Sequence, residues 1–259
     1  MRKLLLGFIF LALTLSAIGC NKTSENPIVK IKDDSLEKLV RYALDKPKGN
    51  LYENELKTIK NLSYGKNRSM LLSYRNDKLI ALEKQMGDSI DLVELKYLNN
   101  LESIDLYGIK VSNIDALKYT PNLTRLSLWE TGNSDISILG SLTNLTELHL
   151  GYNEISDISP LKNLNKLKIL RLTSNNVSDI IALSSLTSIT ELFLEGNKIK
   201  DISPLKNLTK LTIIRLDNNE ITDISVLKDM HSLEYISLRN NKIADFSILT
   251  DLNIQNVEK

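Results

Sequence analysis

The sequence predicts an α/β solenoid, in which short repeats stack side by side and share one parallel β-sheet. The main observation is a recurring pattern of Leu/Ile, two residues, Leu/Ile, one residue, Leu. The pattern begins at Leu101, Leu123, Leu145, Leu167, Ile189, Leu211 and Leu233. Each start lies 22 residues after the previous one, as in 123 − 101 = 22. A second observation is an Asn that recurs with the same period, eight positions after most starts.

A period between 20 and 29 residues with this spacing of leucines is the signature of a leucine-rich repeat. We therefore expect a leucine-rich-repeat solenoid with a concave parallel sheet and short turns or 3₁₀ segments on the convex side. Stacked repeats need a cover over their first apolar cross-section, so we also expect a helical N-terminal cap.

Each repeat should contribute one short strand to the concave sheet. In the segment 145–150, Leu148 and Leu150 are expected to point inward, while Glu147 and His149 point outward, because side chains alternate along a strand. The same alternation in every repeat leaves one sheet face open. Repeat proteins commonly bind partners on this face.

The chain must turn inside the stack after each strand, and an inward Asn amide can pair backbone groups there that would otherwise be buried without a partner. We expect this ladder at Asn153, Asn175, Asn197, Asn219 and Asn241, and not in the first two repeats, where Ile109 and Thr131 stand instead. A following Asp, as in Asp157-Ile-Ser-Pro160-Leu161, suits a capped turn or 3₁₀ segment.

The N-terminus has the pattern of a secretory signal, which we place at residues 1–19. Arg2 and Lys3 precede an apolar run, Leu4 to Ile18, that is shorter than the roughly 20 residues of a membrane-spanning helix. Ala17-Ile18-Gly19-Cys20 then resembles a bacterial lipobox, whose Cys carries lipid after cleavage. Cys20 is the only Cys in the chain. The alternative is a plain signal peptide in which Cys20 has no special role.

Residues 20–32 are polar, contain Pro27 and are interpreted as the lipidated Cys and a tether. Residues 33–60 are expected to form the helical cap, with helices near Asp33–Asp45 and Tyr52–Lys57 and with Asp34 and Glu37 as a capping pair. Residues 61–94 are expected to hold a degenerate first repeat with an insertion of about 20 residues, since Ile59 to Leu101 is 42, or 22 plus 20. Within the insertion, residues 70–82 fit a β-hairpin, with a helix that starts at Asp77 as the alternative.

The repeat array is expected over residues 95–254, followed by a tail at 255–259. Residues 254–257 could instead form a partial last strand, and the sequence shows no obvious C-terminal cap. The pattern LTNLTELHLGYNEISDISPL (142–161) resembles the internalin-type repeat of bacterial surface proteins, and DSLEKLVRYALDKPKGNLYENEL (34–56) resembles the internalin cap. Internalins usually continue into an immunoglobulin-like segment and a wall anchor, so we expect the lipid to replace the anchor here.

Aromatic, aliphatic and Arg side chains gather at the outward positions of the predicted strands. Such residues are enriched at the centres of protein interfaces, although scattered apolar residues are normal on any surface. The candidate partner-binding residues are Tyr107, Arg125, Trp129, His149, Ile169, Arg171, Phe193, Ile213, Arg215 and Tyr235. We expect Trp129 and Phe193 to be anchors that the core does not need, and Arg171 and Arg215 to fix orientation.

Other functional classes find less support. With 33 basic and 32 acidic residues, no strong field favours nucleic acid. Asp105, Ser127 and His149 share one row, but a Ser triad needs its His in the middle, so we predict no enzyme and no catalytic residues. His231 is expected at the convex surface. The Asp column could form a calcium ladder but is better explained by turn capping, and we predict no metal and no cofactor.

The sequence thus predicts a monomeric, secreted protein that is anchored by lipid on Cys20 to the bacterial cell membrane or outer membrane. It is expected to bind a protein on its concave face, as an adhesin-like or internalin-like surface module. The alternative is a structural or assembly scaffold of the bacterium's own envelope, with no host role.

Substituting Cys20→Ser should leave the protein without lipid, because the thiol is the acceptor atom. The expected result is a precursor that is retained or a chain that is released from the membrane. Metabolic labelling with a fatty-acid analogue checks this prediction, and equal label in wild type and variant would contradict it.

Overall fold

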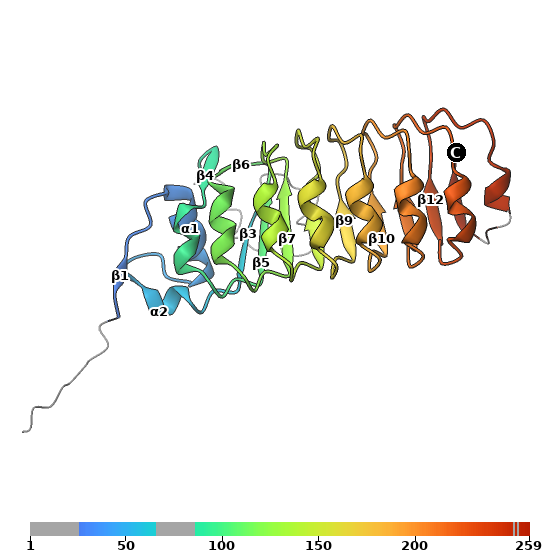
Figure 1. Cartoon of the computed structure of the whole chain (residues 1–259). Coiled ribbons are helices and arrows are strands. Elements are labelled where there is room, and N and C mark those ends of the chain that lie inside the picture. The colour runs from blue at the N-terminus through green and yellow to red at the C-terminus, as the bar shows by residue number, and fades with distance from the viewer. Residues whose placement is uncertain (1–25, 66–85, 251, 253) are drawn as a thin grey trace, which may run out of the picture.

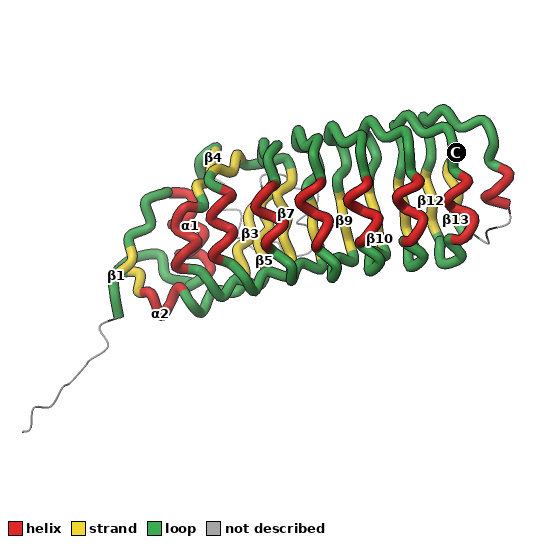
Figure 2. Tube along the Cα trace, in the orientation of Figure 1, coloured by secondary structure: helices red, strands yellow, loops and turns green. Residues whose placement is uncertain are grey.

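A computed structural model describes residues 26–65, 86–250, 252 and 254–259 of the chain, which form one elongated stack of repeats (Figure 1). The expected signal peptide, Cys20 and the hairpin or helix at 70–82 lie outside the described residues. The predicted leucine-rich-repeat solenoid with 22-residue repeats is confirmed. Strands line one side of the stack and 3₁₀ helices line the other (Figure 2).

The main sheet has nine parallel strands in the order β13-β12-β11-β10-β9-β8-β7-β5-β3. Their bounds are β3 (Asn61–Gly65), β5 (Ser103–Tyr107), β7 (Arg125–Trp129), β8 (Glu147–His149), β9 (Ile169–Arg171), β10 (Glu191–Phe193), β11 (Ile213–Arg215), β12 (Tyr235–Ser237) and β13 (Asn256–Glu258). Leu148 pairs with Leu170 and Leu170 with Leu192, so the 22-residue period becomes the register of the sheet. These inward side chains are fully buried, and burying each one stabilises the fold by about 1.5–3 kcal/mol.

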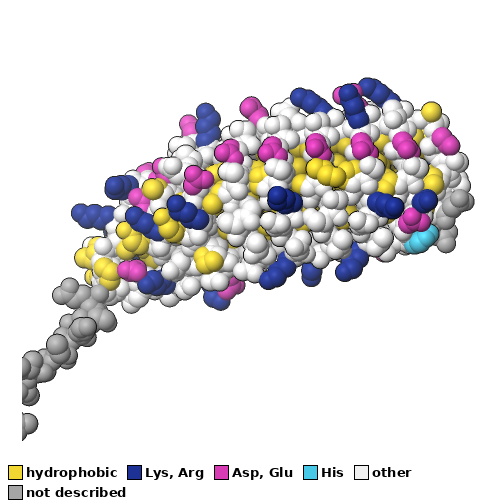
Figure 3. Space-filling model, in the orientation of Figure 1, with side chains coloured by type: hydrophobic (Ala, Val, Ile, Leu, Met, Phe, Trp, Pro, Cys, Tyr) yellow, Lys and Arg dark blue, Asp and Glu magenta, His cyan; other side chains and the backbone are white. Residues whose placement is uncertain are grey.

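Short 3₁₀ helices form the convex side, as predicted. They are η1 (Val93–Tyr97), η2 (Ile114–Tyr119), η3 (Ser137–Ser141), η4 (Ser159–Asn163), η5 (Ile181–Ser185), η6 (Ser203–Asn207), η7 (Ser225–Asp229) and η8 (Ser247–Thr250). Asp157 Oδ1 accepts a hydrogen bond from the Ser159 backbone N–H at 2.8 Å, and Oδ2 accepts one from the Ser159 hydroxyl at 3.0 Å. The Asp column therefore caps turns, and acidic side chains recur regularly along this face (Figure 3).

The N-terminal cap contains β1 (Ile28–Val29), α1 (Asp34–Ala43), β2 (Leu51–Tyr52) and α2 (Glu53–Leu56). Helix α1 packs Leu36, Leu39 and Val40 into the core beside the first repeat strand, so it covers the apolar end of the stack. Its N-cap is Asp33, which accepts from the Leu36 N–H, and not the expected Asp34. The correction follows from geometry, because Asp33 is the last residue with extended backbone before the helix.

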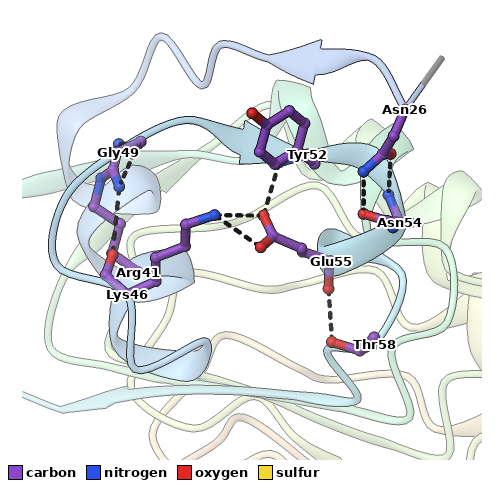
Figure 4. A network of polar contacts seen from close by, with 8 residues as sticks. All are labelled: Asn26, Arg41, Lys46, Gly49, Tyr52, Asn54, Glu55 and Thr58. Carbon is purple, nitrogen blue, oxygen red and sulfur yellow. Dashed lines mark hydrogen bonds and ion pairs between the residues drawn. The ribbon is translucent and has the colours of Figure 1, made fainter.

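Polar contacts tie the parts of the cap to one another (Figure 4). The Lys46 ammonium donates to both oxygens of Glu55, at 2.7 and 2.8 Å, and Glu55 also accepts from the Tyr52 N–H. The Arg41 guanidinium donates to the Gly49 carbonyl. These bonds join α1 to the loop and helix that follow it, so the cap covers the first repeat as one unit.

Two features mark the ends of the array. At the N-terminal end, β3 pairs with β5 with Leu62 opposite Ile104, and a separate two-stranded sheet joins β4 (Ser89–Asp91) to β6 (Lys110–Ser112). The expected tail at 255–259 is wrong, because Asn256–Glu258 form β13 and pair with β12. Val257 there takes the inward place opposite Ile236 without the full leucine pattern.

The Asn ladder holds successive turns together. Asn197 Nδ2 donates to the carbonyls of Leu172 and Leu194, both at 2.9 Å, and its Oδ1 accepts from the Val177 N–H at 3.0 Å. Each ladder amide thus bonds backbone groups of its own repeat and of the repeat before it. At the first ladder position, Asn153 Oδ1 also accepts a hydrogen bond from the backbone N–H of Thr131, the residue that stands where the previous repeat would have its ladder Asn. The Thr131 N–H is therefore paired although that repeat has no ladder Asn.

Asn197→Ala and Asn219→Ala should each lower the free energy of unfolding by about 1–3 kcal/mol, because buried backbone groups lose their partners. The measurement is denaturant unfolding of the full chain. Asn163→Ala is the matched control, since Asn163 is exposed in η4. Equal midpoints for all three variants would show that the ladder does not stabilise the stack.

Candidate partner-binding face

The open face of the nine-stranded sheet presents three rows of side chains, where a row means residues aligned across neighbouring strands. The register aligns Arg125, Glu147, Ile169, Glu191, Ile213 and Tyr235 in the first row. It aligns Asp105, Ser127, His149, Arg171, Phe193, Arg215 and Ser237 in the second row. Tyr107 and Trp129 lie side by side in the third. All ten candidate binding residues therefore lie on one face.

Trp129 lies on this face but is not open to solvent as expected. Its side chain is only 9% exposed, and its ring stacks on Tyr107 at 6.3 Å between centroids and lies 5.3 Å from the ring of Tyr152. The indole covers Gly151, where an added Cβ would lie 2.5 Å from Trp129 Cζ3. Trp129 does not belong to the main hydrophobic core cluster, but it is packed within the face, because Gly151 in the next repeat has no side chain and gives the indole a place to lie.

Tyr152 was not predicted as part of the face. It follows the strand, adopts a left-handed backbone with φ of 55°, and is 53% exposed. We call Tyr107, Trp129 and Tyr152 the aromatic cluster. Because Trp129 is mostly covered, the two tyrosines provide the accessible surface of this cluster. The sequence does contain a clue to this cluster. Gly151 leaves room for the Trp129 ring, and Tyr152, the next residue, places a second aromatic ring beside it.

Phe193 is also mostly covered, at 7% exposure. The Arg171 guanidinium carbon lies 3.8 Å from the centroid of the Phe193 ring, and that of Arg215 lies 5.7 Å from it. Arg215 also lies 5.1 Å from the Tyr235 ring. We call Arg171, Phe193, Arg215 and Tyr235 the cation–π stack. Phe193 therefore packs against its neighbours rather than standing free as expected, and such contacts fix the guanidinium positions.

Ion pairs join neighbouring strands of the same face. Arg125 pairs with Glu147 and, at 3.3 Å, with Asp105. Arg171 pairs with Glu191 at 3.4 Å, and Arg239 pairs with Glu258 at 3.2 Å. Sequence reasoning placed Asp105, Glu147 and Glu191 in the rows but missed these pairs, because most of them join residues in different rows, where side-chain conformation decides the contact. The face is therefore largely neutralised by its own side chains.

His149 lies next to Arg171 in the second row, and the charge of Arg125 in the first row also acts on it. Burial, and then the positive charges of Arg171 and Arg125, lowers the pKa of His149 from 6.5 to about 4. Its Nε2 atom is buried and has no hydrogen-bond partner within the described chain. The side chain is therefore neutral near pH 7, since protonation would add a buried positive charge close to Arg171 and Arg125.

The chemistry of the face does not match a hydrolase. The register places Ser127 between Asp105 and His149, so the His cannot bridge the other two as a triad requires. Within residues 26–65, 86–250, 252 and 254–259, no group of three or more His, Cys, Asp or Glu side chains could hold a metal ion. No helix in the same ranges has the length and apolar character needed to cross a membrane.

Comparison with known proteins agrees with this architecture. A family model described as leucine-rich repeats (2 copies) matches residues 121–163, 143–187, 165–207, 187–229 and 209–253. Together these matches span 121–253, which is 133 of 259 residues. The chain belongs to the leucine-rich-repeat family. None of the curated proteins compared with it matches.

Solved structures place this leucine-rich-repeat protein near the internalins. It is similar to internalin C2 of Listeria monocytogenes, with 28% identity and a TM-score of 0.76, over 87% of this chain and 92% of the other. The internalin inlF of the same species gives 28% identity and a TM-score of 0.66, over 87% and 75%. A plant peptide hormone receptor, solved in complex with RGF2, shares the fold, with 22% identity, a TM-score of 0.56, and coverage of 78% and 37%.

The comparisons support an internalin-like leucine-rich-repeat protein. Proteins of this fold are typically binding scaffolds rather than enzymes, and they bind protein partners. The open sheet face of the solenoid is therefore the candidate site for a partner, and its aromatic cluster and cation–π stack are the groups to test.

Gly151→Ala should push the Trp129 indole outward, because the new methyl group cannot share space with the ring. Since Trp129 is the only Trp in the chain, its fluorescence reports the change directly. The expected result is a red-shifted emission maximum and stronger quenching by acrylamide. Gly140→Ala is the control, because its Cβ would meet Pro160 and not Trp129. An unchanged spectrum in Gly151→Ala would contradict the packing of the cluster.

The stability of the protein should depend on His149 in mildly acidic solution. Its pKa is lower in the folded chain than in the unfolded chain, so the unfolded state takes up the proton first and gains stability as pH falls. The free energy of unfolding therefore decreases as the pH falls from about 6.5 to about 4, and this decrease approaches ~3 kcal/mol. Unfolding curves of wild type and His149→Gln across this range measure it. A difference between the two proteins that does not change with pH would contradict the prediction.

Proposed function

We propose that this leucine-rich-repeat protein is a lipid-anchored protein of the bacterial cell envelope that binds another protein on its concave face. The lipobox-like residues before Cys20 support the anchor, and the similarity to internalins supports the binding role. The lipid and the tether at residues 20–32 would hold the solenoid near a membrane while leaving its open sheet face free. The protein acts as a monomer at the outer side of that membrane, in an adhesin-like role.

One observation carries the binding proposal. Aliphatic, aromatic and Arg side chains gather on the open face, where Ile169 and Ile213 are half-buried and Tyr152 and Arg215 are exposed. Because the inward positions are filled by Leu and Ile, the core does not require apolar residues at positions 169 and 213. Apolar and Arg groups of this kind are enriched at the centres of protein interfaces.

The alternative role, a scaffold of the bacterium's own envelope, uses the same face but a different partner. Protease treatment of whole cells distinguishes the two roles. Cleavage of the solenoid in intact cells supports an outward-facing adhesin-like module. Protection in intact cells, together with cleavage after lysis, favours the envelope scaffold.

The binding face is tested by substitutions that remove apolar surface and keep the core. Ile169→Ser and Ile213→Ser should weaken binding of a partner recovered by pull-down, with a loss of about 2 kcal/mol if they lie at a hot spot, while the melting temperature stays nearly constant. Lys162→Ala and Lys206→Ala, in η4 and η6 on the convex side, are the matched controls and should bind normally.

Trp129→Ala and Phe193→Ala are less suitable, because both side chains are packed and their loss should lower stability as well as binding. If the convex variants lose the partner and the concave variants keep it, the binding face lies on the other side of the solenoid.

A further inference from the structure

Among the four arginines of the concave face, Arg215 differs from the others because it has no ion pair within the described chain. Three of them have a carboxylate partner in their own chain, as described above for Arg125, Arg171 and Arg239. Arg215 makes no ion pair and no side-chain hydrogen bond within the part of the chain that the structure describes, and it is exposed. Its five N–H donors are therefore available to an outside group.

Two acids near Arg215, one close in sequence and one in the same row, are already engaged. Asp217, two residues after the end of β11, accepts hydrogen bonds from the Ser237 hydroxyl and from the Arg239 N–H. Glu258, in the same row across β12 and β13, accepts from Ser237 and pairs with Arg239. Both carboxylates already accept hydrogen bonds from other donors, so neither needs Arg215 as a partner.

The position of Arg215 is nevertheless well defined. Its guanidinium carbon lies 5.1 Å from the Tyr235 ring centroid and 5.7 Å from that of Phe193. Ring faces attract the cation and limit its rotamers, but they accept none of its planar N–H donors. A guanidinium held in this way loses little conformational freedom when it forms two parallel hydrogen bonds to a carboxylate.

The surroundings of Arg215 are apolar as well as aromatic. Ile213 precedes it by two residues on the same strand and face, and Tyr235 lies opposite Ile213 on β12. A carboxylate at Arg215 would thus have an aliphatic and an aromatic surface next to it. A segment that alternates or mixes acidic and apolar side chains is complementary to this arrangement.

We propose that Arg215 is the anchor for an Asp or Glu side chain of the protein partner, with apolar residues beside that acid packing on Ile213 and Tyr235. This inference rests on the proposed function and names the chemistry of the partner. It assigns a different role to Arg125, Arg171 and Arg239, whose charges are used within the sheet.

The test uses the full chain in mild detergent and a random-peptide phage library as the probe. Peptides selected on the wild-type chain should be enriched in Asp and Glu next to Leu, Ile or aromatic residues. This enrichment should disappear on Arg215→Gln and remain on Arg239→Gln, which is the matched control on the same face. Selection without enrichment of acids, or with equal enrichment on Arg215→Gln, overturns the inference.

Synthetic peptides from the selection make the test quantitative. Changing the selected Glu to Gln should weaken binding to the wild-type chain by about 10–100-fold, the range for a hydrogen bond to a charged group. The same change should have little further effect on Arg215→Gln, which shows that the two groups meet. Arg215→Lys should rescue only part of the affinity, because the ammonium keeps the charge and loses the paired donors.

The outcomes separate this inference from the proposed function. Peptides that lose binding to Ile169→Ser and Ile213→Ser but bind Arg215→Gln normally leave the concave site in place and refute the role of Arg215. Peptides that bind all three variants normally contradict both proposals. If Arg215→Gln lowers the melting temperature, the Glu-to-Gln peptide on the wild-type chain decides the question, because it needs no variant protein.

Discussion

The pairing of buried backbone groups at each turn of the stack is the constraint on which the rest of this structure depends. A repeat of 22 residues turns inward after each strand, where the core excludes water and leaves amide groups that need partners. The ladder Asn side chains supply them, as when Asn219 Nδ2 donates to the carbonyls of Leu194 and Leu216. Because each amide bonds its own repeat and the previous one, an insertion inside a repeat would break two turns at once. The ladder therefore fixes the period from Leu123 to Leu233, the repeats that its Asn side chains join.

A fixed period has a consequence for the surface. Residues at equal offsets become neighbours about 4.8 Å apart in the sheet, so each outward side chain packs against the next repeat rather than against its own. Trp129 lies over Gly151 and Arg171 lies over Phe193 for this reason. The concave face is accordingly a second packed layer, and its large aromatic residues contribute to stability as well as to the shape of the face. Exposed area on this face comes from residues such as Tyr152 and Arg215, which contact neighbouring rings but are not covered by them.

The sequence was sufficient to predict features that depend on period and alternation alone. These include the parallel sheet, the inward Leu and Ile positions, the Asn ladder, the 3₁₀ segments capped by Asp and the helical N-terminal region. It was less informative where the outcome depends on which side chains happen to meet. The burial of Trp129 depends on Gly151, and the pairing of Arg171 with Glu191 depends on side-chain conformations that no spacing rule specifies. The strand at Asn256–Glu258 was offered only as an alternative to a tail, as a partial strand at 254–257, because it keeps the backbone register while losing the leucine pattern. Here backbone hydrogen bonds to β12, and not apolar periodicity, define the last strand.

The balance of charges on the concave face bears on how a partner could be selected. The outward rows contain both acids and arginines, and most of them are joined in pairs across neighbouring strands, so the face does not present a strong field of one sign. Without such a field, long-range attraction contributes little to association, and recognition depends on close contact between complementary groups. In that setting a single positioned charge without a partner has more influence on specificity than the total charge of the chain. Arg215 is a residue of this kind among the described residues of the face, since Phe193 and Tyr235 define its position while leaving its hydrogen-bond donors available.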